Sequence, residues 1–433
     1  MALVYPFHAY RYDPGVVGDL DRVVAQPYDK TTPEMQDRYY QDSPYNVVRI
    51  TLNLEKRSDP ETTYPDAGAT FRRWIEEGVL VEDSQPAFYP YYQEYAIDGH
   101  TRLQRGFIAL LDLGQSQSAI IPHEHTLAAP KQDRLNLMRS LEGNEDLIYM
   151  LYADEARTVD RVMDAAVSGR RPEIEVTDEY GAVHRLWAIT DPRVLDTIRT
   201  AMSARDLFIA DGHHRFETSV NFMKECAAKG WRPEGMESFD KRMVTCFNSA
   251  SGVTILATHR LLRDLDGFDP RSLLQRLEEH FTVEPAASAT ELWEGMRGGQ
   301  NDHIFGFYAG SMAGFHLLRM KPSAMDTGAL RRHPEAFRDL DVSILHSLVL
   351  EQHLGIDERK LAAQSHIDYE RCRDEAVRKI DAGGHQAAFF LNPTSAAAMQ
   401  RIASLGERMP QKSTDFYPKL LTGLLFMKMK IGK

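Results

Sequence analysis

The stretch from Ile209 to Ser219 places imidazole and charged side chains directly after an apolar run. It reads IADGHHRFETS, so the apolar residues end at Asp211 and Gly212, and two histidines and an arginine follow. We expect a buried strand, a turn and a helix whose first backbone N–H groups have no partners within the helix. These groups and the helix dipole attract anions. The stretch therefore predicts an anion site at the start of the helix.

The side chains of this turn suit a phosphate group. Arg215 would sit in the first helical turn, where its guanidinium could donate two parallel hydrogen bonds to a phosphate. Asp211 could cap the helix or hold a metal ion that bridges phosphates. Cations at a helix N-terminus oppose the dipole at a cost of about 0.3–1 kcal/mol each. We therefore favour a bound anion over the plainer alternative, an Asp-Gly turn with ordinary hydrogen-bonded histidines.

A second polar segment runs from Ile120 to Met138, with the sequence IIPHEHTLAAPKQDRLNLM. His123 and His125 are two residues apart, so both would face the same side of an extended chain. With Glu124 between them, they could form half of a metal site or an acid–base pair. A solvated charged loop is the alternative.

Two basic residues follow where this segment enters a predicted helix. Lys131 and Arg134 could hold a second phosphate group there. Neither this segment nor the turn at Asp211 is a convincing site alone, so we predict that the two meet in space.

A third polar group lies near the C-terminus in MPQKSTDFYPK. Lys412, Ser413 and Thr414 look like a phosphate-contacting trio, but no glycine-rich loop precedes them, so they do not form a P-loop. A cap at Ser413 or Thr414 explains the same spacing equally well. The segment AQPYDKTTP, residues 25–33, indicates only an ordered loop.

The elements that position these groups alternate irregularly between helix and strand patterns. We expect a strand over 46–53, a hairpin over 87–113, and a helix over 342–355. The absence of strict βαβ alternation predicts an α+β or mixed α/β fold. A chain of 433 residues suits two or three domains. Weak boundaries divide it into an N-terminal segment (1–86), a central domain with both histidine motifs (87–267) and a C-terminal segment (268–433).

Composition narrows the class of protein. The net charge is −12, which argues against a nucleic-acid partner. The three scattered cysteines cannot form a cysteine zinc site or a disulfide framework, and they favour a reducing cytoplasm. No run approaches the roughly 20 apolar residues of a membrane span, and the N-terminus lacks a signal-peptide pattern.

Longer motifs cover nearly the whole chain. They are PFHAYRYDP, AQPYDKTTPE, IIPHEHT, KQDRLNLM, ADGHHRFET, LDVSILHSLVLE and MPQKSTDFYPKLLTGL, in this order. This set resembles the bacterial and archaeal family known as domain of unknown function one-thousand-and-fifteen. The likeness implies a family but no activity.

The box IADGHHRFETS alone also resembles the signature turn of the ParB/sulfiredoxin superfamily. That superfamily includes chromosome-partition nucleotide-binding proteins, sulfiredoxins and ADP-dependent free-serine kinases, and its strand–turn–helix holds nucleotide phosphates. The resemblance implies a close backbone approach at Gly212 and phosphate contacts from His213, His214 and Arg215. Asp211 matches the acidic position of the serine-kinase branch. The reactive cysteine of sulfiredoxin has no counterpart, so we do not expect sulfinic-acid reduction.

Together these features favour a nucleotide-dependent phosphotransferase, working in either direction on a small hydroxyl compound. Serine or O-phosphoserine follows from the serine-kinase likeness, with Mg²⁺ and ADP or ATP as cofactors. Phosphoryl transfer needs positioning and charge neutralisation. Asp211 or Glu124 would hold Mg²⁺, and Glu124 or a neutral His123 would take the hydroxyl proton. The transferring group would be neutralised by Lys131, Arg134 and Lys412.

Two other functions stay open. A metal-dependent hydrolase would bind zinc through His123, His125 and His213, with Glu124 as general base. A ParB-like nucleotide-binding module is disfavoured by the acidic charge and by the lack of a clear basic helix-turn-helix. The sequence does not determine the direction of transfer or whether the chain forms an oligomer.

Overall fold

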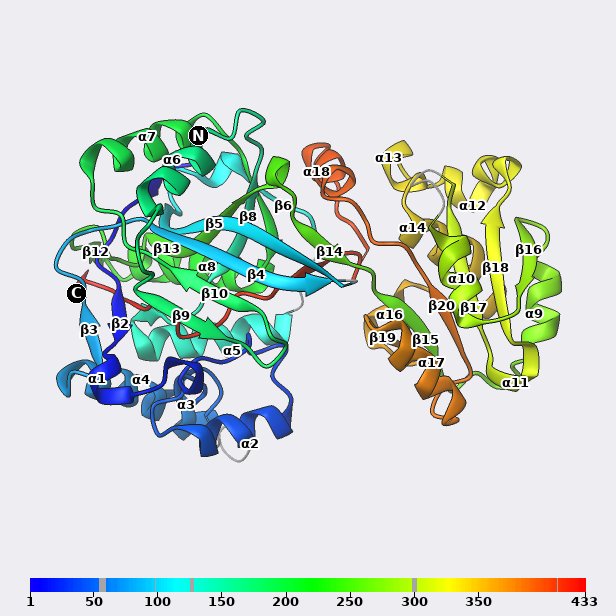
Figure 1. Cartoon of the computed structure of the whole chain (residues 1–433), viewed down its shortest axis with the longest axis horizontal. Helices are drawn as coiled ribbons and strands as arrows, with labels where there is room; N and C mark the ends of the chain where they lie inside the picture. The colour runs from blue at the N-terminus through cyan, green and yellow to red at the C-terminus, as the bar shows by residue number, and fades with distance from the viewer. Residues whose placement is uncertain (54–59, 98, 125–127, 298–301, 411) are drawn as a thin grey trace. The chain divides into compact units, whose positions relative to one another are not determined.

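The computed structural model describes residues 1–53, 60–97, 99–124, 128–297, 302–410 and 412–433, which form two compact units. Unit 1 comprises Met1–Pro122, Thr126–Thr254 and Pro418–Lys433, and unit 2 comprises His123–His125 and Ile255–Tyr417. Each unit combines a sheet with helices (Figure 1), so the predicted mixed α/β class is confirmed.

A large sheet forms the centre of unit 1. Its strand order is β6 (Ile120–Pro122), β11 (Leu207–Asp211), β8 (Ile148–Tyr152), β13 (Lys241–Asn248), β5 (His100–Asp112), β4 (Tyr89–Ile97), β10 (Val183–Leu186) and β9 (Ile174–Thr177), with β1 (Val4–Tyr5) beside β5. The pairs β6–β11 and β8–β13 are parallel and the others are antiparallel. The predicted hairpin is β4 and β5, which confirms that expectation.

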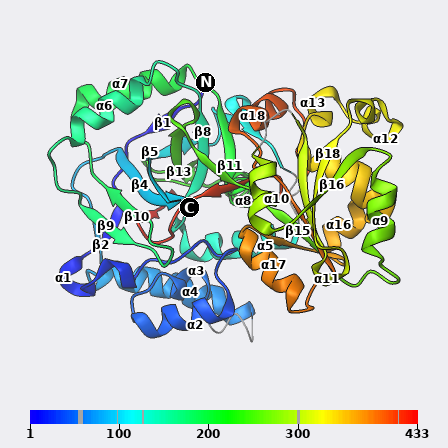
Figure 2. The ribbon, with the colours of Figure 1, turned by 45° about the vertical axis from the view of Figure 1, so that its right-hand side comes forward.

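Helices of unit 1 lie on opposite sides of its large sheet (Figures 1 and 2). One group is α6 (Thr158–Val167) and α7 (Pro192–Ser203); the other includes α2 (Pro33–Asp42), α4 (Pro60–Glu76), α5 (Ala128–Leu141) and α8 (His213–Ala228). Apolar side chains of α6 and α7 pack on β8 and β11 in one core cluster. Helix α5 packs against both α4 and α8. The sheet and α5 thereby fix where α8 begins.

The expected strand over residues 46–53 is wrong, because this segment contains helix α3 (Val48–Thr51). The side chain of Asn46 accepts a hydrogen bond from the Val48 N–H at 2.9 Å and donates to the Val24 carbonyl at 2.9 Å. It therefore opens a helical turn. Val48 and Ile50 are both buried, and a short apolar run buried on all sides does not distinguish strand from helix.

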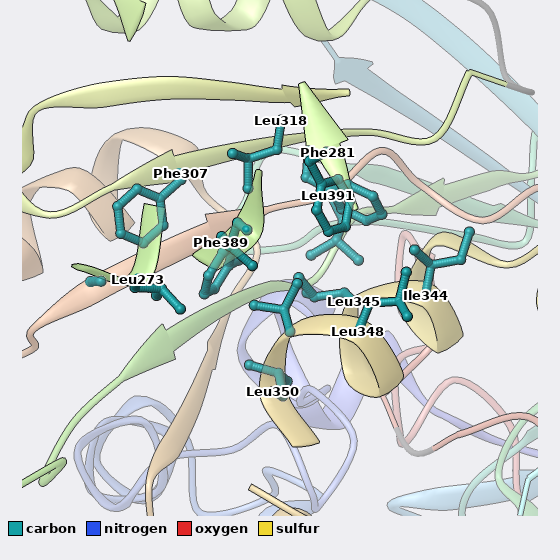
Figure 3. Close-up of a cluster of buried hydrophobic side chains, with 14 of the residues drawn as sticks. Leu273, Phe281, Phe307, Leu318, Ile344, Leu345, Leu348, Leu350, Phe389 and Leu391 are labelled. Carbon is teal, nitrogen blue, oxygen red and sulfur yellow. The ribbon is translucent and has the colours of Figure 1, made fainter. Parts of the chain in front are cut away.

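Unit 2 contains an antiparallel sheet. Its strand order is β16 (Phe281–Ala286), β18 (Phe315–Met320), β17 (Ile304–Tyr308), β20 (Ala387–Phe390), β15 (His259–Leu262) and β19 (Ile367–Glu370). Figure 3 shows its core, where Leu345 and Leu348 lie near Phe389 of β20 and near Leu391, which directly follows this strand. Helices of this unit include α9 (Pro270–Leu277), α10 (Ala289–Met296), α17 (Arg373–Asp381) and α18 (Ala396–Ser404).

The predicted helix over 342–355 is present with one irregularity. It comprises α14 (Asp341–Leu345), a π-helical turn η6 (His346–Glu351) and α15 (Gln352–Leu354). A π-helical turn holds more residues than an α-helical turn, so it rotates the residues that follow it.

The compact units divide the chain differently from the expected segments 1–86, 87–267 and 268–433. The first 86 residues share unit 1 with the large sheet, and the C-terminal residues return to it from Pro418 onward. There β22 (Met427–Lys428) pairs with β7 (Gly143–Asn144). Such pairing between distant segments leaves no local sequence signal. None of the helices in the described part of the chain combines the length and apolar character that crossing a membrane requires.

Candidate phosphate-binding site

The predicted strand–turn–helix is present in unit 1. Strand β11 ends at Asp211, and α8 begins at His213. Gly212 between them has φ 95°, a left-handed conformation, and a Cβ there would lie 3.1 Å from Nε of Arg215. This position therefore requires glycine. Gly212 is also the N-cap, and no side-chain cap hydrogen bond closes the start of α8. The turn thus presents the positive end of the helix.

Asp211 is held by cations rather than acting as a helix cap. Nζ of Lys419 donates to its Oδ2 at 3.2 Å, and Nη2 of Arg215 lies 3.7 Å from its Oδ1. Burial alone would raise the pKa of Asp211, but Lys419, Arg215 and Lys30 outweigh it and hold the pKa well below its ordinary value. Asp211 is therefore a permanent carboxylate beside the start of α8.

Arg215 is buried, with 5% of its surface exposed, and it has internal partners. Its guanidinium donates to the Leu147 carbonyl. Burial lowers the pKa of Arg215. The negative charges of Asp146, Asp211 and Asp29 raise it by more than burial lowers it, so the net shift of the pKa is upward. A bound anion was expected to offset this cation. The carboxylates of the chain itself already provide that compensation.

Arg134 is also buried and internally paired. Its guanidinium donates to Oγ1 and to the carbonyl of Thr51 at 3.2 and 3.1 Å, and to Asp133 at 2.8 Å. The guanidinium carbon lies 4.3 Å from the centre of the Tyr28 ring. Arg134 therefore joins α5 to α3 and to the loop containing Tyr28.

Lys131 connects α5 to α8. Its Nζ donates to Oε2 of Glu217 at 2.6 Å, and its carbonyl accepts a hydrogen bond from Thr218 at 3.4 Å. The basic end of the segment 120–138 therefore meets the helix that follows Asp211. This is the part of the predicted encounter that lies within unit 1.

His214 is half-buried, whereas His213 is buried. Burial lowers the pKa of His214, and Lys131 and Arg215 lower it further; Glu217 and Asp29 act in the opposite direction without cancelling the shift. The imidazole is consequently neutral near pH 7 and able to accept a proton.

Sequence reasoning missed two contributors to this site. The loop of residues 25–33 brings Lys30 close enough to lower the pKa of Asp211, and Asp29 close enough to act on Arg215 and His214. Lys419 stands in the C-terminal motif, five residues after the last member of the trio that we selected. Only the return of the C-terminal segment to unit 1 reveals its role.

His123 and Glu124 belong to unit 2. His123 is fully buried, with Nε2 3.0 Å from Oγ1 of Thr414, and its carbonyl accepts a hydrogen bond from the Met409 N–H at 2.7 Å. Glu124 forms a β-bridge with Met409. The structure thus brings together the second and third predicted groups. The roles of His123 and Glu124 in catalysis stay predictions.

The other members of the C-terminal trio have structural contacts. Oγ of Ser413 donates to the Pro410 carbonyl at 2.5 Å. Lys412 is exposed and has φ 58°, and its carbonyl accepts from Arg260 at 3.1 Å. Phosphate contacts from Lys412, Ser413 and Thr414 stay predictions.

The metal-binding roles predicted for Asp211, Glu124, His123 and His213 stay predictions. Within the described residues, the one group with suitable spacing is Glu279, His280 and His353 in unit 2. The zinc set includes His125, which lies outside the described residues.

A group of buried charged side chains packs around Arg215, in the first turn of α8. A cavity of about 10 Å³ there is lined by charged side chains, namely Arg134, Glu145, Asp146, Arg215 and Arg242, with Leu137, Met138 and Thr218. Arg242 pairs with Asp146. Burial and the charge of Asp146 raise the pKa of Glu145 to about 7, against lowering by Arg134 and Arg242.

We expect Glu145→Gln to stabilise the protein more at alkaline than at acidic pH. The pKa of Glu145 is raised from 4.5 in the unfolded chain to about 7 in the folded state, so the folded state binds the carboxyl proton more tightly than the unfolded state does. This difference stabilises the fold at low pH, and the stabilisation is lost as the pH rises through 7. A glutamine at this position does not ionise, so the variant does not lose this stabilisation as the pH rises. Between about pH 5 and pH 8 the variant should gain on the order of 2 kcal/mol over the parent. Urea unfolding at several pH values measures this, with exposed Glu76→Gln as control; a gain that does not grow with pH would contradict the buried-carboxyl account.

The comparison with family models identifies this chain. The family described as "Protein of unknown function (DUF1015)" matches residues 4–343. The chain belongs to this family, as its ordered motifs indicated. The match ends before the π-helical turn and before Lys419. No curated protein is similar enough to count as a match.

Several solved structures are similar to this chain at low identity. A conserved hypothetical protein from Pyrococcus furiosus has 10% identity and a TM-score of 0.33, covering 72% of this chain and 93% of its own. A free serine kinase in complex with AMP has 12% identity and a TM-score of 0.34, covering 71% and 86%. A C-terminally truncated SbnI from Staphylococcus aureus has 11% identity and a TM-score of 0.35, covering 73% and 85%. These values are too low to assign an activity by likeness.

Proposed function

We propose that unit 1 is a nucleotide-dependent phosphotransferase whose phosphate site is the start of α8. The observation that carries the proposal is the turn at Gly212, where a strand ends and a helix without a side-chain cap begins. Its N–H groups are suited to phosphate oxygens. The resemblance of the IADGHHRFETS box to a nucleotide-phosphate signature supports the same reading.

Three lysines around this turn complete the proposed phosphate site. Lys419 has 7% of its surface exposed, and its Nζ lies 3.2 Å from Oδ2 of Asp211. Lys30 acts on the same carboxylate, and Lys131 acts on His214. We assign phosphate contacts to these lysines and to the backbone of the turn. Arg215 and Arg134 donate to the main-chain carbonyls of Leu147 and Thr51, whereas Lys419 pairs with Asp211 at the turn itself. We therefore assign the two arginines to positioning the turn.

Mg²⁺ would accompany the nucleotide. It binds carboxylate oxygens and phosphates together, and Asp211 and Asp29 are carboxylates that both act on Arg215 at the helix start. We propose that these two carboxylates would hold the ion, which would shield charge on the phosphates.

We assign His214 the role of general base within unit 1. Its lowered pKa leaves the imidazole neutral, and it stands in the first turn of the helix that would hold the phosphates. A hydroxyl compound bound there would give its proton to this imidazole. Serine or O-phosphoserine is our proposed substrate, on the serine-kinase likeness of the box.

A turnover assay tests this function. The full chain is incubated with Mg²⁺ and either ADP with O-phosphoserine or ATP with serine, and the products are followed by ³¹P NMR. We expect phosphoryl transfer that requires both partners in at least one direction. Phosphate release that ignores the nucleotide would indicate a hydrolase and contradict the proposal.

Lys419→Met should weaken binding of ADP by about ten- to hundredfold, because a charge-assisted contact contributes about 1.5–3 kcal/mol. Calorimetric titration with Mg²⁺ and ADP measures the effect. Lys428→Met, an exposed lysine in the same C-terminal segment, is the matched control and should bind as the parent does. Equal affinity in both variants would remove Lys419 from the site.

A further inference from the structure

Three potential metal ligands converge in unit 2, and none of them is used in the proposed function. Glu279, His280 and His353 each offer one ligand atom, and these atoms lie within 4.8 Å of one another. Oε2 of Glu279 is 3.9 Å from Nε2 of His280. The two imidazole rings have centroids 6.1 Å apart, with an angle of 46° between their planes. Small side-chain rotations would bring all three groups to one ion.

His353 shows an unused coordination position. Its Nε2 is buried and has no hydrogen-bond partner among the described residues. Burial lowers the pKa of His353, Arg276 and His280 lower it further, and Glu279 opposes them. The ring is therefore neutral near pH 7. A buried ring nitrogen without a partner is costly to the fold, and a metal ion would satisfy it.

The backbone holds the two histidines in place. The N–H of His280 donates to the Leu277 carbonyl at 3.0 Å, and its carbonyl accepts from the Lys321 N–H at 2.9 Å. His280 therefore stands fixed between α9 and β16. His353 lies in α15, directly after the π-helical turn η6, whose extra residue rotates the following side chains.

Gln352 supplies a neighbouring polar group. Its amide nitrogen lies 3.1 Å from Nε2 of His280. In this arrangement the Gln352 amide occupies the lone pair of His280 Nε2 that a metal ion would use. If the amide turned, its oxygen would face the same position as a further ligand. An open cavity of about 550 Å³, lined in part by Glu279, His280 and Gln352, gives an ion and water a route to the cluster.

We propose that Glu279, His280 and His353 bind a divalent transition-metal ion of the zinc, cobalt and nickel kind. Two imidazoles and a carboxylate are the donors that such ions accept, whereas Mg²⁺ prefers an all-oxygen set. Three protein ligands leave a coordination position toward the cavity for water or for a second ligand. The Arg276 guanidinium acts on His353, so the affinity is expected to be lower than that of a closed structural zinc site.

The test uses the full chain without an affinity tag, stripped with chelator and kept free of nucleotide. Co²⁺ is titrated while its visible absorption is recorded, and Zn²⁺ is then used to displace it. We expect the parent to bind Co²⁺ with an intense tetrahedral-type band that Zn²⁺ removes. Glu279→Gln and His353→Gln should each weaken binding about tenfold or more.

His316→Gln is the matched control, because His316 lies on β18 of the same unit and also has a buried ring nitrogen without a partner among the described residues. It should bind Co²⁺ as the parent does. Glu279 has a side chain 66% exposed, so Glu279→Gln is expected to fold and decides the outcome even if His353→Gln does not. A parent that gives no Co²⁺ band, or a Glu279→Gln variant with unchanged affinity, would overturn the proposal.

Discussion

Arg215→Ala is expected to lower the free energy of unfolding by about 3–5 kcal/mol, the usual cost of removing one partner from a buried ion pair. Arg215 is 5% exposed and offsets the charges of Asp146 and Asp211. Without it, these carboxylates lose a compensating cation, and the Leu147 carbonyl loses a donor. Urea unfolding followed by circular dichroism measures the change.

Arg139→Ala is the control for this prediction. Arg139 also joins α5 to α8, through a paired contact with Glu225 at 2.7 Å, but 41% of its side chain is exposed. Exposed pairs contribute about 0–1 kcal/mol, so this variant should be nearly as stable as the parent. Equal losses for the two variants, or a negligible loss for Arg215→Ala, would contradict a buried charge network behind the turn.

His214→Gln should reduce phosphoryl transfer by about 10²–10⁴-fold while binding of ADP survives, because the variant lacks a base but keeps the turn. Glutamine cannot accept the substrate proton, yet it is similar in size and uncharged. Steady-state turnover and calorimetric ADP binding, measured on the same preparation, separate the two effects. A variant as fast as the parent would exclude His214 as the base.

The Glu124→Gln variant tests whether Glu124, the general base expected from the sequence, takes the substrate proton. If Glu124 takes the hydroxyl proton, its variant rather than His214→Gln should lose turnover with nucleotide binding intact. Glu124 belongs to unit 2 and bridges Met409. The pair of variants thus distinguishes a base inside unit 1 from the base predicted by motif spacing.

The strand, turn and helix around Gly212 could be predicted because the signals were local. An apolar run ending at Asp-Gly, followed by a helical pattern, specifies a turn whatever the remainder of the chain does. The hairpin of β4 and β5 was predictable for the same reason. The segment at Val48 was not, because burial on every side removes the periodicity that separates strand from helix.

The charge partners of the site could not be predicted, because they depend on contacts between distant segments. Lys419 reaches Asp211 from 208 positions later in the chain. Asp146 meets Arg215 through the packing of α8 near the residues before β8. Spacing within a motif shows which side chains are polar, but it does not show that Arg215 and Arg134 are buried and already paired. The sequence therefore predicted the strand, turn and helix, but it assigned phosphate contacts to two arginines that are buried and paired within the chain.

A crystal structure of the full chain with ADP and Mg²⁺ would show directly whether the turn at Gly212 holds the phosphates of the nucleotide. We expect the terminal phosphate of ADP to lie at the first turn of α8, accepting hydrogen bonds from the backbone after Gly212 and from Lys419. ADP phosphates bound elsewhere on the chain, with the turn at Gly212 unoccupied, would contradict it.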